Sequence, residues 1–244
     1  MPKHAKHIGI VACSAEGAAL CYTTICVEGA ELMGPYAHPE VSLHTFPLSD
    51  YMACVDGDNW PGVADLMLGS AEKLAQAGAD FLICPDNTIH RVFDLVRPRS
   101  PLPWLHIAEE VASEAARQGY RRLGILGTRY LVESDVYPGK LEAQGIEFRR
   151  PQPEQRERIN QIIFDELVYG KFTPPSLQYV VDVIGSLQQA GCDAVVLGCT
   201  EIPLLVSPQD SPLPTLDSTR LLARAALRKA VGAAVPGKAG RSSQ

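Results

Sequence analysis

The chain carries one sequence pattern twice. Residues 76–87 read Q-A-G-A-D-F-L-I-C-P-D-N, and residues 189–200 read Q-A-G-C-D-A-V-V-L-G-C-T. When the two copies are superposed, their apolar runs coincide and Asp86 falls on Cys199. The repeat predicts that two halves of the chain share one fold. Each half would then place a proton-active side chain at the same structural point.

A second echo precedes each copy of this pattern. H-I-G-I-V-A-C-S at 7–14 matches R-L-G-I-L-G-T-R at 122–129. Along the chain, short apolar runs alternate with longer segments whose apolar residues recur every three or four positions. Such runs are typical of parallel strands covered on both faces, and the longer segments are typical of amphipathic helices. The alternation predicts β-α-β units with right-handed crossovers.

The same patterns give the expected elements. Strands are predicted at 7–12, 41–46, 79–84, 121–127, 145–149 and 193–198. Helices are predicted at 15–30, 60–77, 107–118, 133–144, 154–169, 175–190 and 217–231. Gly78, Gly145 and Gly191 follow predicted helices at the position where a left-handed residue commonly ends a helix.

The predicted fold class is α/β, with two pseudo-symmetric, doubly wound parallel-sheet domains and a site in the cleft between them. We place an N-terminal domain at 1–103 and a second domain at 104–213. A helix within 214–231 is expected to return and pack on the first domain. Residues 232–244 are expected to form a disordered tail.

The composition excludes several classes of function. A chain of 244 residues can bury one large core or two smaller ones. The net charge of −6 is spread over both signs, whereas nucleic-acid binding needs a basic face. No run approaches the roughly 18–20 apolar residues of a membrane helix, and the first residues do not resemble a signal peptide. We therefore expect a cytoplasmic protein without a nucleic-acid or membrane partner.

The chain has seven cysteines, and one of them is a candidate for chemistry. The odd number and the absence of a C-x-x-C motif argue against a disulfide framework or a zinc site, so no metal is predicted. Cys84 and Cys192 lie in apolar runs and are expected to be core residues. Cys199 instead stands just after such a run, behind a glycine.

Polar residues follow four of the predicted strands. They are Cys13-Ser14, Asp86-Asn87-Thr88, Thr128 and Cys199-Thr200-Glu201. In open parallel sheets, ligands bind beyond the carboxyl ends of the strands, and the N–H groups of the helices that follow attract anions. Asn87, Thr88 and Thr200 would add side-chain donors. The predicted ligand is a small carboxylic acid.

Asp86 and Cys199 would flank this ligand. A base on one side and an acid on the other can remove a proton from one face of a carbon and return one to the opposite face. A helix N-terminus is expected to lower the pKa of the Cys199 thiol. No cofactor motif is present, so no cofactor is predicted. The alternative readings are that Asp86 is only a turn or cap residue and that Cys199 is only a small buried one.

Three further polar residues near these positions fit purely structural roles. His90 and His106 are expected to be helix-surface or packing residues rather than catalysts. Glu201 fits a charge in the first turn of a helix as well as it fits a site residue.

These residues resemble the aspartate/glutamate racemase family, which works without pyridoxal phosphate. L-G-C-T-E-I-P-L-L at 197–205 is similar to its second catalytic motif, and P-D-N-T-I-H at 85–90 is similar to its first. The resemblance covers about residues 7–231 and implies an amino-acid racemase, commonly a homodimer, with a small acid substrate. By motif position, the substrate carboxylate would be held by Asn87, Thr88 and Thr200. The same cleft would be lined by Thr128 and Ser14.

The chain departs from the family pattern at two places. The first catalytic position, usually cysteine, is Asp86. The stretch after Pro47, where an arginine often meets a second substrate carboxylate, contains none, which puts a preference for aspartate or glutamate in doubt. The ordinary pKa values of Asp and Cys differ by about 4.6 units, or about 6 kcal/mol, so ionised Asp86 with neutral Cys199 should dominate. Burial of Asp86 could narrow this gap.

The sequence therefore predicts a cofactor-independent isomerase or racemase that acts at the α-carbon of a small amino acid or related carboxylic acid, with Asp86 and Cys199 transferring the proton. One alternative is a decarboxylase or lyase on the same scaffold, with Cys199 as proton donor. Another is a non-catalytic protein that binds a small acid. The substrate side chain and the stereochemical preference stay open.

Overall fold

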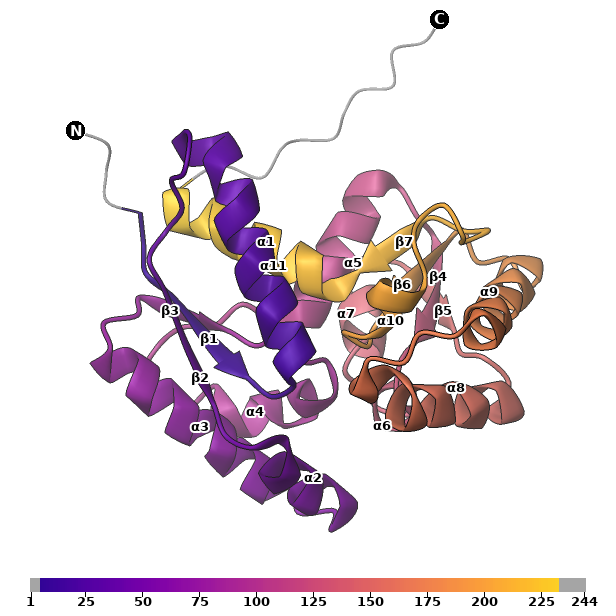
Figure 1. Cartoon of the computed structure of the whole chain (residues 1–244), viewed down its shortest axis with the longest axis horizontal. Coiled ribbons are helices and arrows are strands. Elements are labelled where there is room, and N and C mark those ends of the chain that lie inside the picture. Colours follow the sequence, from indigo (N-terminus) through magenta and orange to yellow (C-terminus); the bar gives the residue numbers. More distant parts are fainter. Residues whose placement is uncertain (1–4, 233–244) are drawn as a thin grey trace, which may run out of the picture.

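The structure, a computed structural model, describes residues 5–232. The tail predicted at 232–244 lies, apart from Gly232, outside the described residues. Two parallel sheets form two lobes that stand side by side in Figure 1. The predicted α/β class with two parallel-sheet regions is confirmed.

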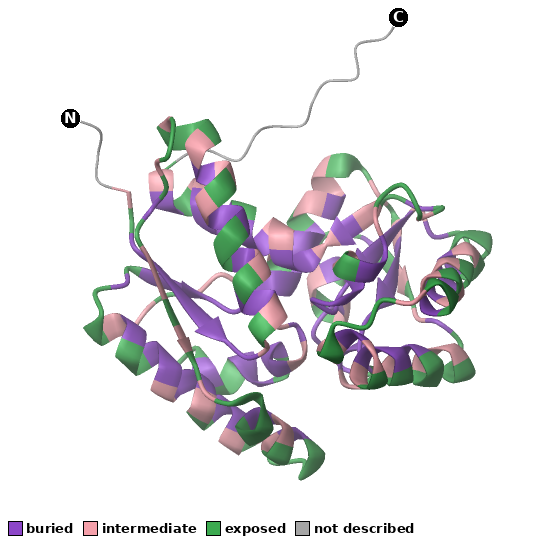
Figure 2. Ribbon diagram, in the orientation of Figure 1, coloured by how far each residue is buried: buried purple, intermediate pink, exposed green. Residues whose placement is uncertain are grey.

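The first lobe contains a three-stranded sheet in the order β2-β1-β3. Its elements are β1 (Ile8–Ala12), α1 (Ala15–Met33), β2 (Val41–Thr45), α2 (Leu48–Asp56), α3 (Trp60–Gln76), β3 (Phe81–Ile83), the 3-10 helix η1 (Thr88–Val92) and α4 (Phe93–Val96). The helix α3 packs on the sheet face that carries Val11 and Leu82. The helix α1 packs on the opposite face, against Ile8 and Ile10. The central strand is therefore buried on both faces (Figure 2).

The second lobe contains a four-stranded sheet in the order β5-β4-β6-β7. Its elements are α5 (Ile107–Gln118), β4 (Arg122–Leu126), α6 (Arg129–Val132), α7 (Pro138–Glu142), β5 (Glu147–Arg149), α8 (Pro153–Asp165), the 3-10 helix η2 (Leu167–Tyr169), α9 (Pro174–Gln189), β6 (Ala194–Leu197), α10 (Ile202–Leu205) and β7 (Thr215–Asp217). The helices α8 and α9 cover the face with Val195 and Leu197. The helices α5 and α7 cover the face with Leu123 and Ile125.

The last helix joins the lobes. α11 (Ser218–Val231) begins directly after β7, which belongs to the second sheet. It packs against both α1 and α5. Its Leu222 and Ala226 share a core cluster with Ile10 of the first sheet. The first and last described elements, β1 and α11, thus share the core of the first lobe, as the indigo and yellow ribbons of Figure 1 show.

The repeat in the sequence is also a repeat of strand register. Gly9 of β1 lies opposite Leu82 of β3, and Gly124 of β4 lies opposite Val195 of β6. All four strands run parallel within their pairs. The repeated letters therefore occupy equivalent positions in the two sheets.

The glycine of each pair allows a helix to approach its sheet closely. A Cβ on Gly9 would lie 3.3 Å from the Cβ of Leu74 in α3, and a Cβ on Gly124 would lie 3.3 Å from the Cβ of Leu187 in α9. These distances are tighter than ordinary van der Waals contact, because carbon atoms prefer a separation of about 3.5–4.0 Å. Glycine is thus required at both positions for the same packing reason.

The aspartate of each repeat fastens the start of the central strand. The Asp80 carboxylate accepts a hydrogen bond from the His7 backbone N–H at 2.7 Å. Its counterpart Asp193 accepts from the backbone N–H groups of Arg121 at 2.7 Å and Arg122 at 3.1 Å. The aspartate thus recurs in both copies of the pattern because it binds the backbone at the start of the central strand. Neither Asp80 nor Asp193 lines the cavity described below.

The predicted helix at 133–144 is wrong. The chain instead forms α6, which ends at Val132, and α7, which begins at Pro138. Proline has no N–H to donate to the carbonyl four residues earlier, but it fits the first position of a new helix. A continuous helix through Pro138 would have lost that hydrogen bond.

Several short elements were not predicted from the sequence, among them η1 and α4, which follow β3. The strand β7 has three residues and follows Pro214, so its apolar pattern is too short to recognise. The helix α2 is flanked by Pro47 and Gly57. The helix α10 has four residues. Among residues 5–232, no helix is long and apolar enough to cross a membrane.

Substitution of Gly124 tests the close approach of α9 to its sheet. We expect Gly124→Ala to lower the free energy of unfolding by about 1–3 kcal/mol, because the added methyl group overpacks the interface with Leu187. Gly185, in the middle of α9, has no heavy atom within 4 Å of an added Cβ. The control Gly185→Ala should raise stability by about 0.5–1 kcal/mol through helix propensity. Urea unfolding of both variants measures the difference, and equal effects would contradict the packing explanation.

Candidate active site

The two lobes enclose a cavity of about 70 Å³ beyond the carboxyl ends of their strands. One water needs about 10–15 Å³ by the same measure, so the cavity can hold the reacting part of a small molecule. Its polar side consists of residues that follow β1, β3, β4 and β6. All the predicted site residues line it, namely Ser14, Asp86, Asn87, Thr88, Thr128, Cys199 and Thr200. The structure thus brings the predicted set together, while the role of each residue stays a prediction.

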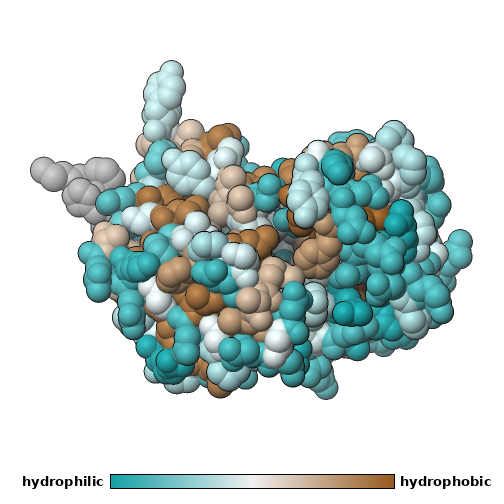
Figure 3. Space-filling model, turned by 60° about the horizontal axis from the view of Figure 1, so that its bottom comes forward, coloured by the Kyte–Doolittle hydropathy of each residue, from teal (hydrophilic) through white to brown (hydrophobic). Residues whose placement is uncertain are grey.

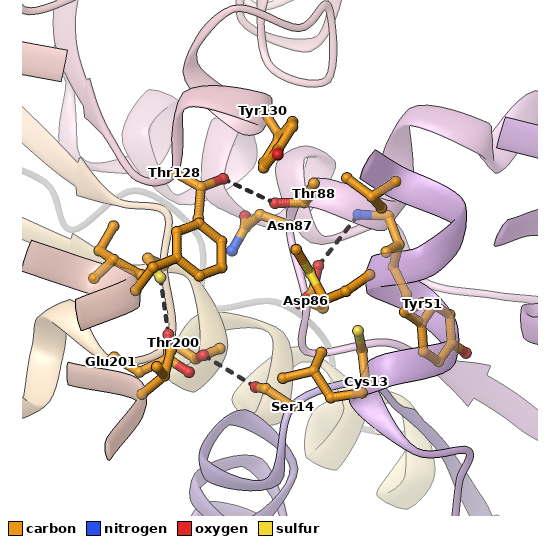
Figure 4. Close-up of a pocket in the computed structure, with 18 of the residues that line it drawn as sticks. Cys13, Ser14, Tyr51, Asp86, Asn87, Thr88, Thr128, Tyr130, Thr200 and Glu201 are labelled. Atoms are coloured by element: carbon orange, nitrogen blue, oxygen red, sulfur yellow. Dashed lines mark hydrogen bonds between the residues drawn. The ribbon is translucent and has the colours of Figure 1, made fainter. Parts of the chain in front are cut away.

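Asp86 lies in the turn between β3 and η1, near the centre of Figure 4. Its Oδ1 accepts a hydrogen bond from the Ile89 backbone N–H at 3.2 Å. Burial, and to a smaller extent the charge of Glu201, raise the pKa of Asp86 from its ordinary value of 3.8 to about 6, although the Ile89 hydrogen bond opposes this shift. The carboxyl group can therefore exist as carboxylate or acid near neutral pH, as a general base requires.

Cys199 holds the equivalent position after β6, but its thiol is protonated. Its Sγ donates a hydrogen bond to Oε2 of Glu201 at 2.8 Å, and both residues are buried. Burial and then the negative charge of Glu201 raise the pKa of Cys199 well above 9.0. The expectation of a lowered thiol pKa is wrong, because burial of the thiol and the charge of Glu201 outweigh any effect of the four-residue helix α10.

The two shifts together fix the proton distribution. The pKa of Asp86 rises, but the pKa of Cys199 rises as well, so the gap between the two groups is not closed. Ionised Asp86 with neutral Cys199 is the resting state at neutral pH. The charge of Asp86 is itself one of the causes that raise the pKa of Cys199, so the two side chains interact electrostatically.

Two pairs of hydroxyl groups bridge the lobes on either side of Asp86. Ser14 Oγ lies 3.3 Å from Thr200 Oγ1, and Thr88 Oγ1 lies 3.1 Å from Thr128 Oγ1 (Figure 4). Each pair joins a residue of the first lobe to a residue of the second. Ser14 and Thr128 also cap the helices α1 and α6, accepting from backbone N–H groups three residues later. These hydroxyls are therefore held in place by local backbone structure while they face the other lobe.

Asn87 also lines the cavity, but its amide is largely engaged in the protein. Its Oδ1 accepts from the Tyr137 hydroxyl at 2.6 Å, and its Nδ2 donates to Ser218 Oγ at 2.9 Å. Ser218 in turn donates to the Leu197 carbonyl at 2.9 Å. One amide hydrogen of Asn87 is left for a ligand. The residue thus links β6, α11 and the segment before α7 to the turn that holds Asp86.

His90 supports the Asp86 turn from behind. Its Nδ1 lies 2.6 Å from the Asp86 carbonyl, and its Nε2 lies 3.3 Å from the backbone nitrogen of Ile107. A neutral ring with the proton on Nδ1 satisfies both contacts, and burial holds the pKa of His90 well below its ordinary value. His106 packs edge-on against it, 4.6 Å between ring centroids. The packing alternative for both histidines is therefore correct, and the helix-surface alternative is not, because both are buried.

Other cavity residues were given no site role from the sequence. Cys13 was named only as one of the polar residues after the first strand. It lies below Asp86 in Figure 4, and burial followed by the charge of Asp86 raises its pKa. Its match to Thr128 in the echo of 7–14 and 122–129 could have marked it as a cavity residue. Tyr51 and Tyr130 also line the cavity. No local signal points to these two, since they reach it only through the placement of α2 and α6.

Within residues 5–232, no group of three or more His, Cys, Asp or Glu side chains is arranged to hold a metal ion. The groups that the cavity does offer are two carboxyl groups, two thiols, several hydroxyls and the amide of Asn87. This set can bind a small acid and move a proton.

Comparison with known proteins agrees with this geometry. The Asp/Glu/Hydantoin racemase family matches residues 9–226, which is most of the chain. The chain belongs to this family. The resemblance noted in the sequence and the prediction of an enzyme of the racemase type are thereby confirmed.

Individual members of the family show the same relationship. The chain is 25% identical over 190 residues to the broad specificity amino-acid racemase RacX of Bacillus subtilis (strain 168), an alignment covering 77% of this chain and 80% of RacX. A Yersinia pestis structure provisionally assigned as an Asp/Glu racemase superposes with a TM-score of 0.85 and 33% identity, covering 93% of this chain and 99% of that one. An aspartate racemase homologue from Pyrococcus horikoshii OT3 gives 0.78 and 29%, covering 92% and 99%.

The pKa shift of Asp86 predicts how this Asp/Glu racemase-family protein responds to pH. A carboxyl whose pKa is raised on folding stabilises the protein below its unfolded pKa, and that stability is lost as the pH rises through about 6. Asp86→Asn removes the buried charge, so the variant should be more stable than wild type at about pH 8, by at most about 3 kcal/mol. The difference should vanish near pH 4.

Urea unfolding at several pH values measures this difference. Asp94→Asn, on the exposed face of α4, is the matched control and should show no such dependence. An Asp86→Asn variant that is less stable than wild type at about pH 8 would contradict the assigned cause of the shift.

Proposed function

We propose that the protein is an isomerase or racemase that acts, without a cofactor, at the α-carbon of a small amino acid or related carboxylic acid. The observation that carries this proposal is the equivalence of Asp86 and Cys199. They follow β3 and β6 at matching positions in two sheets of the same register, and they line one cavity. A substrate carbon between them would meet one group on each face.

In this mechanism the hydroxyls that bridge the lobes hold the substrate carboxylate. Ser14, Thr88, Thr128 and Thr200 can turn their O–H groups toward an anion, and the free amide hydrogen of Asn87 adds a donor. Such donors also stabilise the charge that develops on the carboxylate when the α-proton leaves. No cation among the described lining residues is available for this purpose, so hydrogen bonds must carry it.

The carboxylate of Asp86 takes the α-proton from one face, and the thiol of Cys199 gives its proton to the other. The electron pair of the C–H bond passes into the enolate-like intermediate and then into the new C–H bond. Asp86 ends as the acid and Cys199 as the thiolate, and exchange with solvent restores the resting state. Glu201 keeps the Cys199 thiol protonated until the S–H group turns from Glu201 Oε2 toward the α-carbon of the substrate.

A second candidate function follows from the protonated thiol. In a decarboxylase or lyase, loss of carbon dioxide creates the carbanion, and Cys199 needs only to protonate it. The raised pKa of Cys199 fits that role, because the thiol is in the donating form from the start. Release of carbon dioxide from a malonate-type acid, without interconversion of enantiomers, would favour this function over racemisation.

Three further expectations from the sequence belong to the proposal. The domain division at 1–103 and 104–213, with 214–231 returning to the first domain, is one. The others are a homodimer and a cytoplasmic location. Sedimentation of the purified protein measures its oligomeric state.

Enantiomer interconversion tests the paired mechanism. Cys199→Ala should lower kcat for interconversion by about 10²–10⁴-fold, because a positioned acid contributes that much. Cys192→Ala is a matched control, since Cys192 is also buried but does not line the cavity. An alanine variant at Cys199 that retains interconversion would exclude this residue as the proton donor.

The pH profile tests the base. We expect kcat/KM for loss of the α-hydrogen, followed by solvent deuterium incorporation, to rise as the pH passes about 6, where Asp86 ionises. It should not fall near pH 9.0, because the pKa of the Cys199 thiol lies well above that value. A profile flat from about pH 4 to 8 would contradict a role for Asp86 as base.

A further inference from the structure

The wall of the cavity divides into a polar and an apolar side. The polar side comes from the strand ends already described. The remaining part of the wall is formed mainly by α2 of the first lobe and by α8 and η2 of the second. The side chains that make it are Leu48, Met52, Val55, Ile163, Phe164 and Val168. A ligand whose carboxylate and α-carbon lie at the strand ends would therefore point its side chain at hydrocarbon.

The apolar side is built from both lobes and is held together across the opening. The Tyr130 hydroxyl of α6 donates to Asp56 Oδ1, at the end of α2, at 2.9 Å. The Tyr130 ring also packs edge-on against Phe164 of α8, with 6.4 Å between centroids. Through these two contacts, Tyr130 connects α2 to α8. On the face shown in Figure 3, apolar surface gathers where the two lobes meet.

The charges around the cavity are all of one sign. Among the described residues that line it, two are acidic, Asp86 and Glu201, and none is Arg, Lys or His. Glu201 is buried and Asp86 is only partly accessible. A second carboxylate on the ligand would be desolvated beside two carboxyl groups without a cation to pair with it. Burial of an unpaired charge is strongly unfavourable, whereas burial of a methyl or methylene group is favourable.

We propose that this site takes α-amino or related carboxylic acids with an aliphatic side chain, and that it discriminates against the dicarboxylic acids aspartate and glutamate. The proposal rests on the proposed function for the position of the α-carbon. The apolar surfaces of α2 and of α8 with η2 recognise the side chain, and the two acidic residues repel a second carboxylate.

The first experiment measures selectivity in the wild-type protein. Leucine, methionine and valine are compared with aspartate and glutamate, as both enantiomers, in two assays. One follows solvent deuterium exchange at the α-carbon, and the other follows binding by calorimetry. We expect kcat/KM, or affinity, to be at least about a hundredfold higher for the aliphatic acids, because the rejected group is a charge without a partner.

The second experiment places a cation in the apolar wall. Met52 is half-buried on α2, so the long side chain of arginine can reach the cavity from there. Met52→Arg should raise affinity for aspartate or glutamate by about tenfold or more and weaken binding of leucine. Ala53→Arg, on the exposed side of the same helix, adds the same charge outside the cavity and should change neither. Thermal unfolding of both variants checks that they are folded.

The outcomes separate this proposal from the proposed function. Exchange that favours aspartate or glutamate in the wild type overturns the aliphatic preference and leaves the racemase function standing. Tight binding of leucine without exchange overturns the function and supports the aliphatic preference. Absence of both binding and exchange with every acid overturns both. A gain for aspartate in Ala53→Arg equal to that in Met52→Arg shows that net charge, not the cavity wall, sets the preference, and overturns the assignment to α2.

Discussion

The equal register of the two parallel sheets is the constraint on which the rest of the structure depends. Parallel pairing of β1 with β3 and of β4 with β6 brings two carboxyl strand ends to one edge of each sheet. Because Gly9 and Gly124 occupy the same place in their pairs, the turns that follow β3 and β6 begin at equivalent points. A shift of one residue in either sheet would turn Asp86 or Cys199 to the other face.

Burial then decides what these two groups can do. Both lie where water is scarce, and desolvation is the largest cause of the raised pKa in each. For a carboxyl group this shift brings titration toward neutral pH, whereas for a thiol it moves titration away from it. Glu201 adds to both shifts in the same direction. Asp86 and Cys199 thus titrate in different pH ranges because burial raises the pKa of a carboxyl group and of a thiol from different ordinary values.

The sequence predicted β1, β3, β4 and β6 because they lie in nearly continuous apolar runs, and it predicted the long helices because their apolar residues recur with the helical period. It failed where an element has only a few residues or where a proline divides a pattern, as at β7 and Pro138. The site residues after β1, β3, β4 and β6 were predictable for another reason: parallel sheets bring the carboxyl ends of their strands together. Tyr51, Met52 and Phe164 were not, since they reach the cavity only through the tertiary placement of α2 and α8.

By itself, the sequence determined the repeat, the parallel α/β class, the pairing of Asp86 with Cys199 and the family to which the chain belongs. These are local or periodic properties, and they are written in neighbouring residues. Only the tertiary structure decided that the pKa of Cys199 is raised rather than lowered, and that the part of the cavity wall formed by α2, α8 and η2 is largely apolar and free of cations. The pKa of the thiol depends on burial and on the side chain of Glu201 turning back toward it. The apolar nature of this part of the wall depends on α2 and α8, which are far apart in the sequence and come together around one cavity only in the folded chain.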